Sequence, residues 1–177
     1  MPSIKQKRID KQADKALREL AKGNMDGLSY LYELYGRLIQ SVAYSIVGNY
    51  ADAEDILQDV MILLCRYAPS YQANTSPRAY VMSITRHRSI DLIRKRKNDL
   101  STDEIGEVLT YDDGELEAME VLDLLSGLPE EEKQIVVLHL YAGLPHRQIA
   151  ELLELTTSAT EKKYRRALEK LKKQYES

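Results

Sequence analysis

Apolar residues recur at steps of three and four along most of this 177-residue chain, and that spacing limits its fold more than any other feature. It places apolar side chains on one face of an α-helix, where a neighbouring element can bury them. No stretch alternates apolar and polar residues convincingly, as a half-buried β-strand would. The sequence therefore predicts an all-α fold without a sheet.

Residues 28–97 contain three segments with this helical spacing. The first carries a stripe that we expect to be buried: Tyr32, Tyr35, Leu38, Ile39 and Val42. The second begins with the carboxylates of residues 52–55, which the helix macrodipole favours in a first turn. Its apolar positions are Ile56, Val60, Leu63 and Leu64. A polar loop from Pro69 to Pro77 precedes the third helix, which we predict over residues 78–96.

Acidic residues are concentrated in one stretch, although the formal net charge of the whole chain is only −3. Residues 98–128 hold ten acidic side chains and no basic one, whereas basic residues slightly outnumber acidic ones on either side. Like charges at this density repel each other and extend a chain, as suits a linker. We therefore predict two small helical domains joined by an acidic linker. The predicted units are an N-terminal helical extension (1–27), a helical bundle (28–97), the linker (98–119) and a C-terminal domain (120–177).

Residues 129–173 have the pattern of one helix followed by a helix-turn-helix. Pro129 suits the start of the first helix, where three glutamates follow it, and Gly143 suits its end. The residues that we expect on its buried face are Ile135, Val136, Leu138 and Leu140. The tight turn of residues 154–156 then separates a short helix, over residues 145–153, from a long final one.

The long final helix combines an apolar stripe with a cationic face, and Ser158 and Glu161 have capping-box spacing near its start. The stripe consists of Thr160, Tyr164, Ala167, Leu168 and Leu171. The basic residues on or beside the opposite face are Lys162, Lys163, Arg165 and Arg166. Such a helix can enter the major groove of DNA, where lysine and arginine reach phosphates and guanine edges. A solvated surface helix is the alternative, since Glu161 and Glu169 lie near this face, but the preceding helix and turn favour DNA binding.

A second basic segment ends the predicted helix of residues 78–96. Six basic residues stand between Arg86 and Lys97, against the single acidic Asp91, and Tyr80 lies upstream. Proteins that bind single strands combine aromatic side chains, which stack on bases, with cations that neutralise the backbone. The alternative is that Tyr80 belongs to the core and that the basic run caps the C-terminal end of a helix.

Asp55, Gln58 and Asp59 share one face of the second predicted helix, by their three- and four-residue spacing. A face of carboxylates and an amide, on a chain with basic DNA-binding elements, suggests a protein partner. An ordinary solvated helix face is the alternative interpretation of these three residues.

In their order along the chain, these segments resemble the bacterial RNA polymerase sigma factors of the sigma-70 family, extracytoplasmic-function (ECF) subgroup. Residues 52–60 (DAEDILQDV) resemble the polymerase-binding helix of that family, and residues 78–97 resemble its promoter-melting helix. Four short segments resemble its C-terminal helix-turn-helix: residues 128–130, 143–144, 148–153 and 166–171. The resemblance covers about residues 28–97 and 120–174, and its specificity comes from the order and separation of all the segments together.

The resemblance implies a role for each candidate residue. Asp55, Gln58 and Asp59 would contact the clamp helices of the largest subunit of core RNA polymerase. The residues that would hold a flipped −10 base and the melted strand are Tyr71, Asn74, Arg78, Tyr80, Arg86, His87, Arg94 and Arg96. The residues that would read the −35 duplex are Lys162, Lys163, Arg165 and Arg166. Core RNA polymerase and promoter DNA are therefore the expected partners, with an anti-sigma factor as a further candidate, and the linker would lie along the polymerase.

The chain departs from the family pattern at several of these positions. Tyr80 stands where the family usually has tryptophan, and His87 where it often has asparagine. Ala159 and Thr160 replace a usual Thr-Val pair, and Glu161 stands where a basic residue is common. We expect these departures to affect the promoter sequence and the efficiency of strand melting rather than the fold.

The sequence gives no sign of catalytic chemistry or of a metal site. Its histidines, His87, His139 and His146, are scattered, whereas a zinc site needs about four ligands. Cys65 stands among aliphatic residues, so we expect it in the core. No phosphate-binding loop or nucleophile motif is present. We therefore expect no enzyme activity, no cofactor, no metal and no small-molecule substrate.

The beginning of the chain lacks the apolar segment of a secretory signal, and no apolar run approaches the ~20 residues that span a bilayer. With a single cysteine, an intramolecular disulfide is not possible, so we expect a cytoplasmic protein without membrane insertion. Two alternative functions stay open. A stand-alone helix-turn-helix transcriptional regulator would need neither the Asp55 face nor the basic segment of residues 86–97. A degenerate sigma-like adaptor would bind polymerase without reading DNA, and would account for Tyr80 and Glu161.

Overall fold

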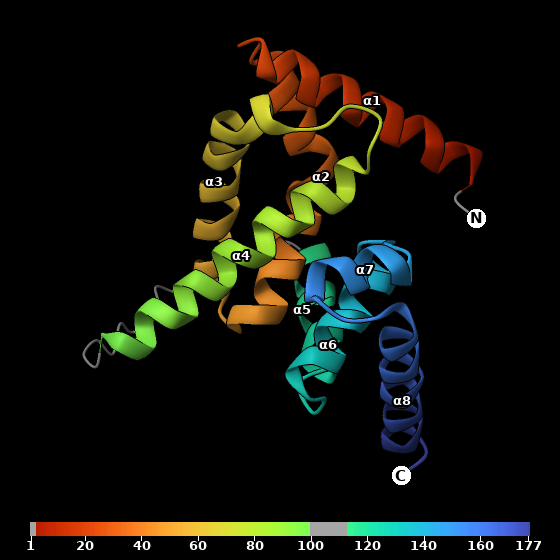
Figure 1. Cartoon of the computed structure of the whole chain (residues 1–177). Helices are drawn as coiled ribbons and strands as arrows, with labels where there is room; N and C mark the ends of the chain where they lie inside the picture. The colour runs from red at the N-terminus through yellow and green to blue at the C-terminus, as the bar shows by residue number, and fades with distance from the viewer. Residues whose placement is uncertain (1–2, 100–112) are drawn as a thin grey trace.

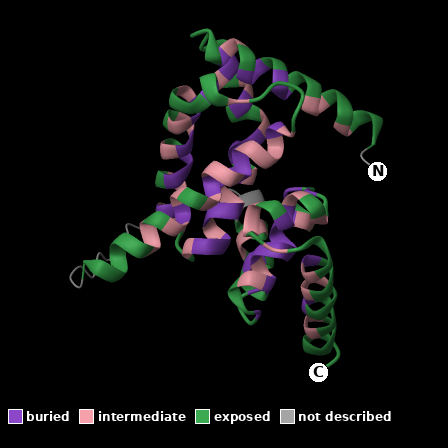
Figure 2. Cartoon of the chain, viewed as in Figure 1, coloured by how far each residue is buried: buried purple, intermediate pink, exposed green. Residues whose placement is uncertain are grey.

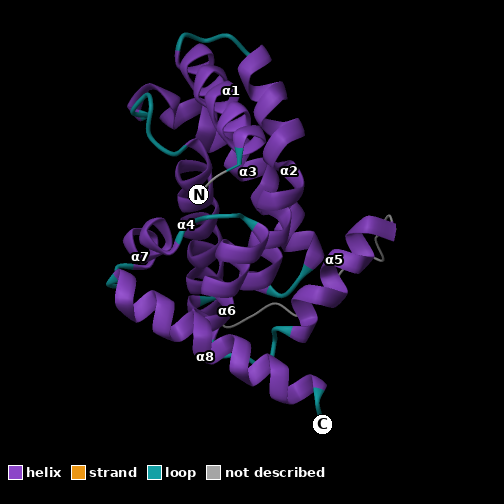
Figure 3. Cartoon of the chain, turned by 90° about the vertical axis from the view of Figure 1, so that its right-hand side faces the viewer, coloured by secondary structure: helices purple, strands orange, loops and turns teal. Residues whose placement is uncertain are grey.

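The computed structural model describes residues 3–99 and 113–177. Every regular element in these two ranges is helical, as Figure 3 shows, which confirms the all-α prediction. No described helix combines the length and the apolar character needed to cross a lipid bilayer. The elements are α1 (Ile4–Ala21), α2 (Asp26–Val47), α3 (Tyr50–Tyr67), the 3₁₀ turn η1 (Ala68–Ser70), α4 (Pro77–Asn98), α5 (Asp113–Leu124), α6 (Glu130–Val136), the π-helical turn η2 (Val137–Tyr141), α7 (His146–Leu153) and α8 (Thr157–Tyr175).

Side-chain caps explain where four of these helices begin. Ser3, Asn49 and Ser76 each accept a hydrogen bond, at 3.1 Å, from the backbone N–H three residues later, at the starts of α1, α3 and α4. Thr156 caps α8 in the same way, because its Oγ1 accepts from the N–H of Ala159 at 3.1 Å. The cap of α8 is therefore Thr156, and the capping box predicted at Ser158 is wrong.

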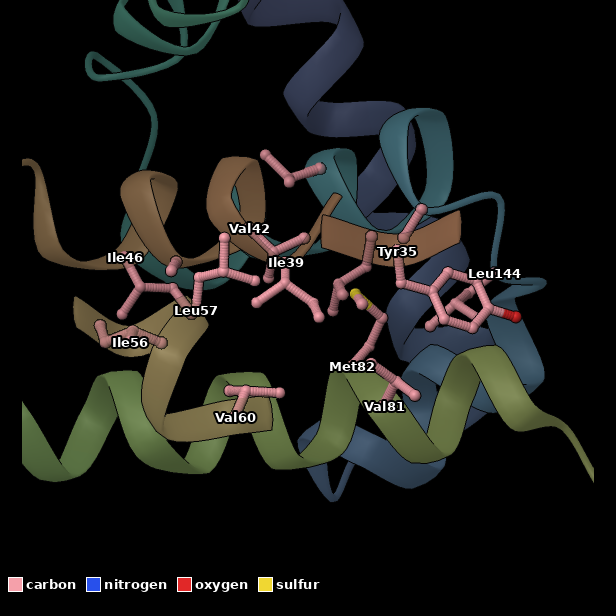
Figure 4. Close-up of a cluster of buried hydrophobic side chains, with 14 of the residues drawn as sticks. Tyr35, Ile39, Val42, Ile46, Ile56, Leu57, Val60, Val81, Met82 and Leu144 are labelled. Atoms are coloured by element: carbon pink, nitrogen blue, oxygen red, sulfur yellow. The ribbon is translucent and has the colours of Figure 1, made fainter. Parts of the chain in front are cut away.

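Helices α1 to α4 pack around one core of aliphatic side chains, part of which Figure 4 shows. The fully buried residues of this core include Leu17, Leu31, Ile39, Ile56, Val60, Leu64, Val81 and Met82. Cys65 packs against the core and is partly buried, as predicted. The N-terminal extension is the helix α1, which packs on α2, η1 and α4. Gly27 allows the close approach of α1 and α2, since a Cβ there would lie 2.4 Å from the carbonyl oxygen of Ala16.

Three side chains that the apolar pattern assigned to the core are exposed instead. Tyr32 is 54% exposed, Leu140 is 59% exposed, and Leu168, next to the buried Ala167, is 38% exposed. The exposure of Leu140 follows from helical geometry: Leu138 and Ala142 are four residues apart and face the core, which leaves Leu140 on the opposite side. Three- and four-residue spacing therefore did not by itself identify the core, since Tyr32 and Leu168 also have it.

Helices α6, α7 and α8, with the turn η2, form the C-terminal domain. Helix α8 packs along both α6 and α7, so α7 and α8 make the predicted helix-turn-helix. The turn between them is tight because Glu154 adopts a left-handed conformation, with φ at 57°. Helix α4 runs to Asn98 and α5 begins at Asp113, so helices occupy both ends of the segment predicted as a linker. Its middle, residues 100–112, lies outside the described residues.

The C-terminal domain packs directly on the N-terminal bundle, beside α2 and α4 (Figure 1). The buried apolar residues of both domains form one continuous core, which Leu144 joins from the C-terminal side. A hydrogen bond also crosses the interface, from Ser76 Oγ to Gln148 Oε1 at 3.2 Å, and Tyr44 on α2 donates its hydroxyl to Asp123 Oδ1 on α5 at 2.9 Å. The start of α4 therefore lies against α7, and α2 lies against α5.

Candidate nucleic-acid interface

Two aromatic residues predicted to contact melted DNA lie together at the start of α4. The rings of Tyr71 and Tyr80 meet edge to face, with their centroids 5.0 Å apart and their planes at 61°. The hydroxyl of Tyr80 donates to the carbonyl oxygen of Tyr67 at 2.8 Å, and that of Tyr71 donates to Asp14 Oδ1 at 2.8 Å. Burial raises the pKa of Tyr71, and its hydrogen bond to Asp14 raises that pKa further, so its hydroxyl stays a neutral donor.

A cleft of about 910 Å³ borders these two rings. Asn74 lines the cleft from the loop between η1 and α4, and Gln148 lines it from α7. Tyr80 is partly buried and packs against the core, while it also borders the cleft. Tyr80 is therefore packed against the core on one side and borders the cleft on another.

Arg78 and Arg86, both predicted to contact DNA, are engaged by the C-terminal domain in this structure. Arg78 Nη1 donates to the carbonyl oxygen of Ala142 at 2.8 Å, and its guanidinium lies 5.9 Å from the ring centroid of Tyr35. Arg86 Nε donates to Gln134 Oε1 at 2.9 Å, and burial lowers the pKa of the Arg86 guanidinium. In this conformation of the protein, these two cations contact protein groups at a domain interface.

The C-terminal half of α4 projects beyond the bundle as an exposed, basic arm (Figures 1 and 2). His87 and Arg94 are exposed on it, as DNA contacts would require, and the Nδ1 of His87 lies 2.8 Å from the carbonyl oxygen of Ser83. Arg96 pairs with Asp52 at the start of α3, which ties the arm to the bundle. The arm therefore presents cations to solvent while one of them also holds its position.

The predicted protein-binding face of α3 is exposed at two of its three residues. Asp55 and Gln58 are exposed, whereas Asp59 is partly buried and accepts a hydrogen bond from Arg88 Nε at 2.7 Å. Ile62, one turn further along the same face, is 60% exposed. The sequence interpretation missed Ile62 because it counted only the polar residues of this face. Together these side chains place an exposed apolar group beside acidic and amide groups on one face of α3.

The four basic residues predicted on α8 fall into two pairs with different surroundings. Lys163 Nζ lies 2.7 Å from Glu131 Oε2, and Arg166 Nη1 lies 3.9 Å from Glu132 Oε1, so both turn toward α6. Lys162 and Arg165 are exposed and form no ion pair with any residue in the described ranges. Of these four residues, Lys162 and Arg165 are therefore the uncommitted cations on the outer face of the helix-turn-helix.

Two histidines and a tyrosine pack together inside the C-terminal domain. The rings of His139 and His146 stack with centroids 4.2 Å apart, and Tyr164 of α8 lies 4.8 and 4.9 Å from them. Burial lowers the pKa of His146, and the neighbouring His139 lowers it further. Within residues 3–99 and 113–177, no group of three or more histidine, cysteine, aspartate or glutamate side chains could hold a metal ion. The three rings contact one another across η2, α7 and α8.

Two family models match the chain. The description of one is Sigma-70 region 2, and it matches residues 31–98. The other is Sigma-70, region 4, and it matches residues 118–171. The matched segments contain every candidate residue on α3, α4 and α8.

Individual proteins with similar sequences or structures agree with these matches. The ECF RNA polymerase sigma factor SigW of Bacillus subtilis (strain 168) is 27% identical, over 90% of this chain and 95% of that protein. The RNA polymerase sigma factor NccH of Alcaligenes xylosoxydans xylosoxydans is 25% identical, over 92% of this chain and 94% of its own.

Two solved structures share the fold at lower sequence identity. CnrH, solved in complex with the cytosolic domain of CnrY, has a TM-score of 0.73 at 21% identity, over 93% of this chain and 97% of its own. The sigma factor RpoE from Bartonella quintana, solved with the anti-sigma factor NepR, has a TM-score of 0.69 at 19% identity, over 84% of this chain and 96% of its own.

Proposed function

Since the chain belongs to the ECF group of the sigma-70 family of RNA polymerase sigma factors, we propose that it binds core RNA polymerase and selects promoters by reading a −35 duplex and capturing melted −10 strand. The proposed work is done by binding alone, in the cytoplasm, and requires no cofactor. The units that would carry it are residues 28–97, for polymerase and the −10 element, and residues 120–177, for the −35 element.

The observation that carries this proposal is the separation of exposed charge between three helices. The exposed face of α3 offers Asp55 and Gln58 beside the apolar side chain of Ile62. The arm of α4 and the outer face of α8 offer exposed cations, such as Arg94 and Lys162. DNA phosphates repel the first kind of surface and attract the other two. One chain therefore has separate surfaces suited to a protein partner, to single strand and to duplex.

Strand capture is assigned to the cleft beside Tyr71 and Tyr80. An aromatic ring whose face is open to the cleft can stack on an unpaired base, and stacking of this kind is worth about 1–3 kcal/mol per base. Asn74 borders the same cleft and can supply amide hydrogen bonds to a base edge. The exposed cations of the α4 arm, among them Arg94, then neutralise the strand that leads away from the cleft.

Duplex reading is assigned to Lys162 and Arg165 on α8, because they are the two cations of the predicted set that no ion pair holds within the described ranges. Arg78 and Arg86 contribute to DNA only when the contacts with Ala142 and Gln134 are released. We therefore expect the domains to separate when the chain forms its complex with polymerase and promoter. An anti-sigma factor is a further candidate partner, as the Bartonella quintana sigma factor was solved with one.

Reconstitution with core RNA polymerase tests the proposal. The chain and core together should initiate transcription from a defined set of genomic fragments that core alone ignores. A stand-alone regulator would bind fragments without core and would not support initiation. A sigma-like adaptor would bind core and leave fragment selection unchanged. Either of these two results contradicts the proposed function.

A further inference from the structure

We propose that Asp14, on α1, is a positioning residue for promoter opening, because its carboxylate holds the loop of residues 71–76 that would capture the unpaired −10 base. This inference rests on the proposed function and adds a residue from the N-terminal extension to it. Asp14 lies outside the segment matched by the region 2 family model, which begins at residue 31.

The carboxylate of Asp14 is buried and fully engaged. The residue is 5% exposed, whereas the other acidic residues of α1, Asp10 and Glu19, are only partly buried. Its Oδ1 accepts two hydrogen bonds from the loop, one from the hydroxyl of Tyr71 at 2.8 Å and one from the backbone N–H of Asn74 at 2.7 Å. Its Oδ2 lies 3.0 Å from Arg18 Nε, one turn along α1. A buried carboxylate is costly unless such partners satisfy it.

These two hydrogen bonds hold the loop in a conformation that it would not adopt freely. Asn74 has a φ of 63°, in the left-handed region that costs most residues about 1–2 kcal/mol but that asparagine tolerates. The acceptor at Asp14 fixes the N–H of this same residue. Elsewhere the described hydrogen bonds of the loop are local, as from Thr75 Oγ1 to the carbonyl oxygen of Gln72, or reach α7 from Ser76. Asp14 is therefore the anchor that the N-terminal bundle supplies to the centre of the loop.

Tyr71 links Asp14 to Tyr80, the proposed stacking residue. Its hydroxyl is bound to Asp14, and its ring meets the ring of Tyr80 at 5.0 Å. Figure 1 shows the loop running beside α1 on its way from α3 to α4. Asn74, one of the loop residues that line the cleft, and the pair of aromatic rings thus both depend on one carboxylate. Asp14 does not itself need to touch DNA.

A scan of abasic sites distinguishes this positioning role from a general role in stability. The probe is the non-template −10 strand of a fragment that the wild-type holoenzyme selects, with each base removed in turn, and the measurement is binding to holoenzyme by fluorescence anisotropy. Wild type should show one position where loss of the base weakens binding about tenfold or more. In Asp14→Ala, intact strand should bind about tenfold more weakly, because two donors lose their acceptor. Removing the same base should then weaken the binding of the strand to the Asp14→Ala holoenzyme by less than about twofold.

Conservative variants and a matched control complete the test. Asp14→Asn keeps an oxygen that can accept from Tyr71 and Asn74, so most of the sensitivity to the missing base should return. Tyr71→Phe removes one of the two donors and keeps the ring, so it should reduce the sensitivity to the missing base by less than Asp14→Ala does. This variant keeps the test usable even if Asp14→Ala folds poorly. Glu19→Ala removes an exposed ion pair with Lys22 on the same helix and should bind every strand as wild type does.

The outcomes separate the inference from the proposed function. If wild type has no base-sensitive position, capture of a −10 base is wrong and Asp14 has nothing to position. If wild type has such a position and Asp14→Ala and Tyr71→Phe keep its full sensitivity, the positioning role alone is wrong. A uniform weakening of all strands, with or without the base, also contradicts it, because that is what loss of general stability produces.

Discussion

The paired and uncommitted cations of α8 allow a matched test of duplex reading. Lys162 is exposed and forms no ion pair with the described residues, whereas its neighbour Lys163 lies 2.7 Å from Glu131. Removing the cation that neutralises one phosphate lowers the salt dependence of DNA binding by about 0.9 in the log–log slope. Over a fourfold rise in salt, the factor by which the affinity of Lys162→Ala falls should therefore be about 3.5 times smaller than the factor for wild type. At low salt it should bind a −35 duplex more weakly than wild type.

Lys163→Ala is the control, because its charge is already used within the domain. Its ion pair with Glu131 is partly exposed on both sides, so it contributes roughly 0.5 kcal/mol to stability. For a chain of this size that corresponds to a fall of about 1–2 °C in melting temperature. The assay is fluorescence anisotropy of a −35 duplex bound to holoenzyme across a salt series, with a thermal melt of each variant. If Lys163→Ala reduces the salt slope as much as Lys162→Ala does, the assignment of duplex reading to the uncommitted cations is refuted.

Three further predictions concern stability and polymerase binding. Gly27→Ala should lower the free energy of unfolding by about 2 kcal/mol or more in a denaturant titration, because its Cβ would lie 2.4 Å from a backbone oxygen. Gly36→Ala is the control: its Cβ would meet only ordinary contacts, so it should not destabilise the protein. Acidification should destabilise the protein through His146, because the pKa of His146 in the folded protein lies below its ordinary value near 6.5. The contribution of His146 to folding stability is therefore complete above about pH 6.5 and is lost as the pH falls through the folded pKa. A melting temperature independent of pH between about 7 and 5 would contradict this. Asp55→Arg combined with Gln58→Ala should weaken core polymerase binding, measured by pull-down, at unchanged helicity; undiminished capture would remove α3 as the polymerase-binding face.

Local patterns in the sequence were sufficient to predict most of the helices and the helix-turn-helix, but α5 begins inside the segment predicted as a linker. The three- and four-residue spacing identified α2, α3, α4 and α8 because each buries one face against neighbours. The same rule failed at Tyr32 and Leu140, where apolar character was not matched by the phase of the buried stripe. The start of α8 was misread because Thr156, rather than Ser158, supplies the capping oxygen.

The parts of the candidate site that could not be predicted depend on long-range packing. Arg86 meets Gln134 across 48 positions of sequence, so no local pattern could reveal that this cation lies at a domain interface. Asp14 was missed for a similar reason, since its partners Tyr71 and Asn74 come from a loop 57 and 60 positions away. One signal was present: Asp14 stands between Ala13 and Leu17, on the side of α1 that the apolar spacing buries. A carboxylate in such a stripe indicates a buried partner.

Division of labour between strand capture and duplex reading is the central claim, and transcription from matched templates tests it most directly. Holoenzymes carrying Tyr80→Ala or Lys162→Ala are compared with wild type on one promoter, first intact and then with its −10 region premelted by mismatches. Both variants should be impaired on the intact promoter, Tyr80→Ala by the roughly 1–3 kcal/mol that stacking on one base supplies. Premelting should restore much of the activity of Tyr80→Ala, because part of the cost of opening is already met, and should not restore Lys162→Ala. Equal rescue of both variants, or an intact promoter on which Tyr80→Ala equals wild type, would contradict this division of labour.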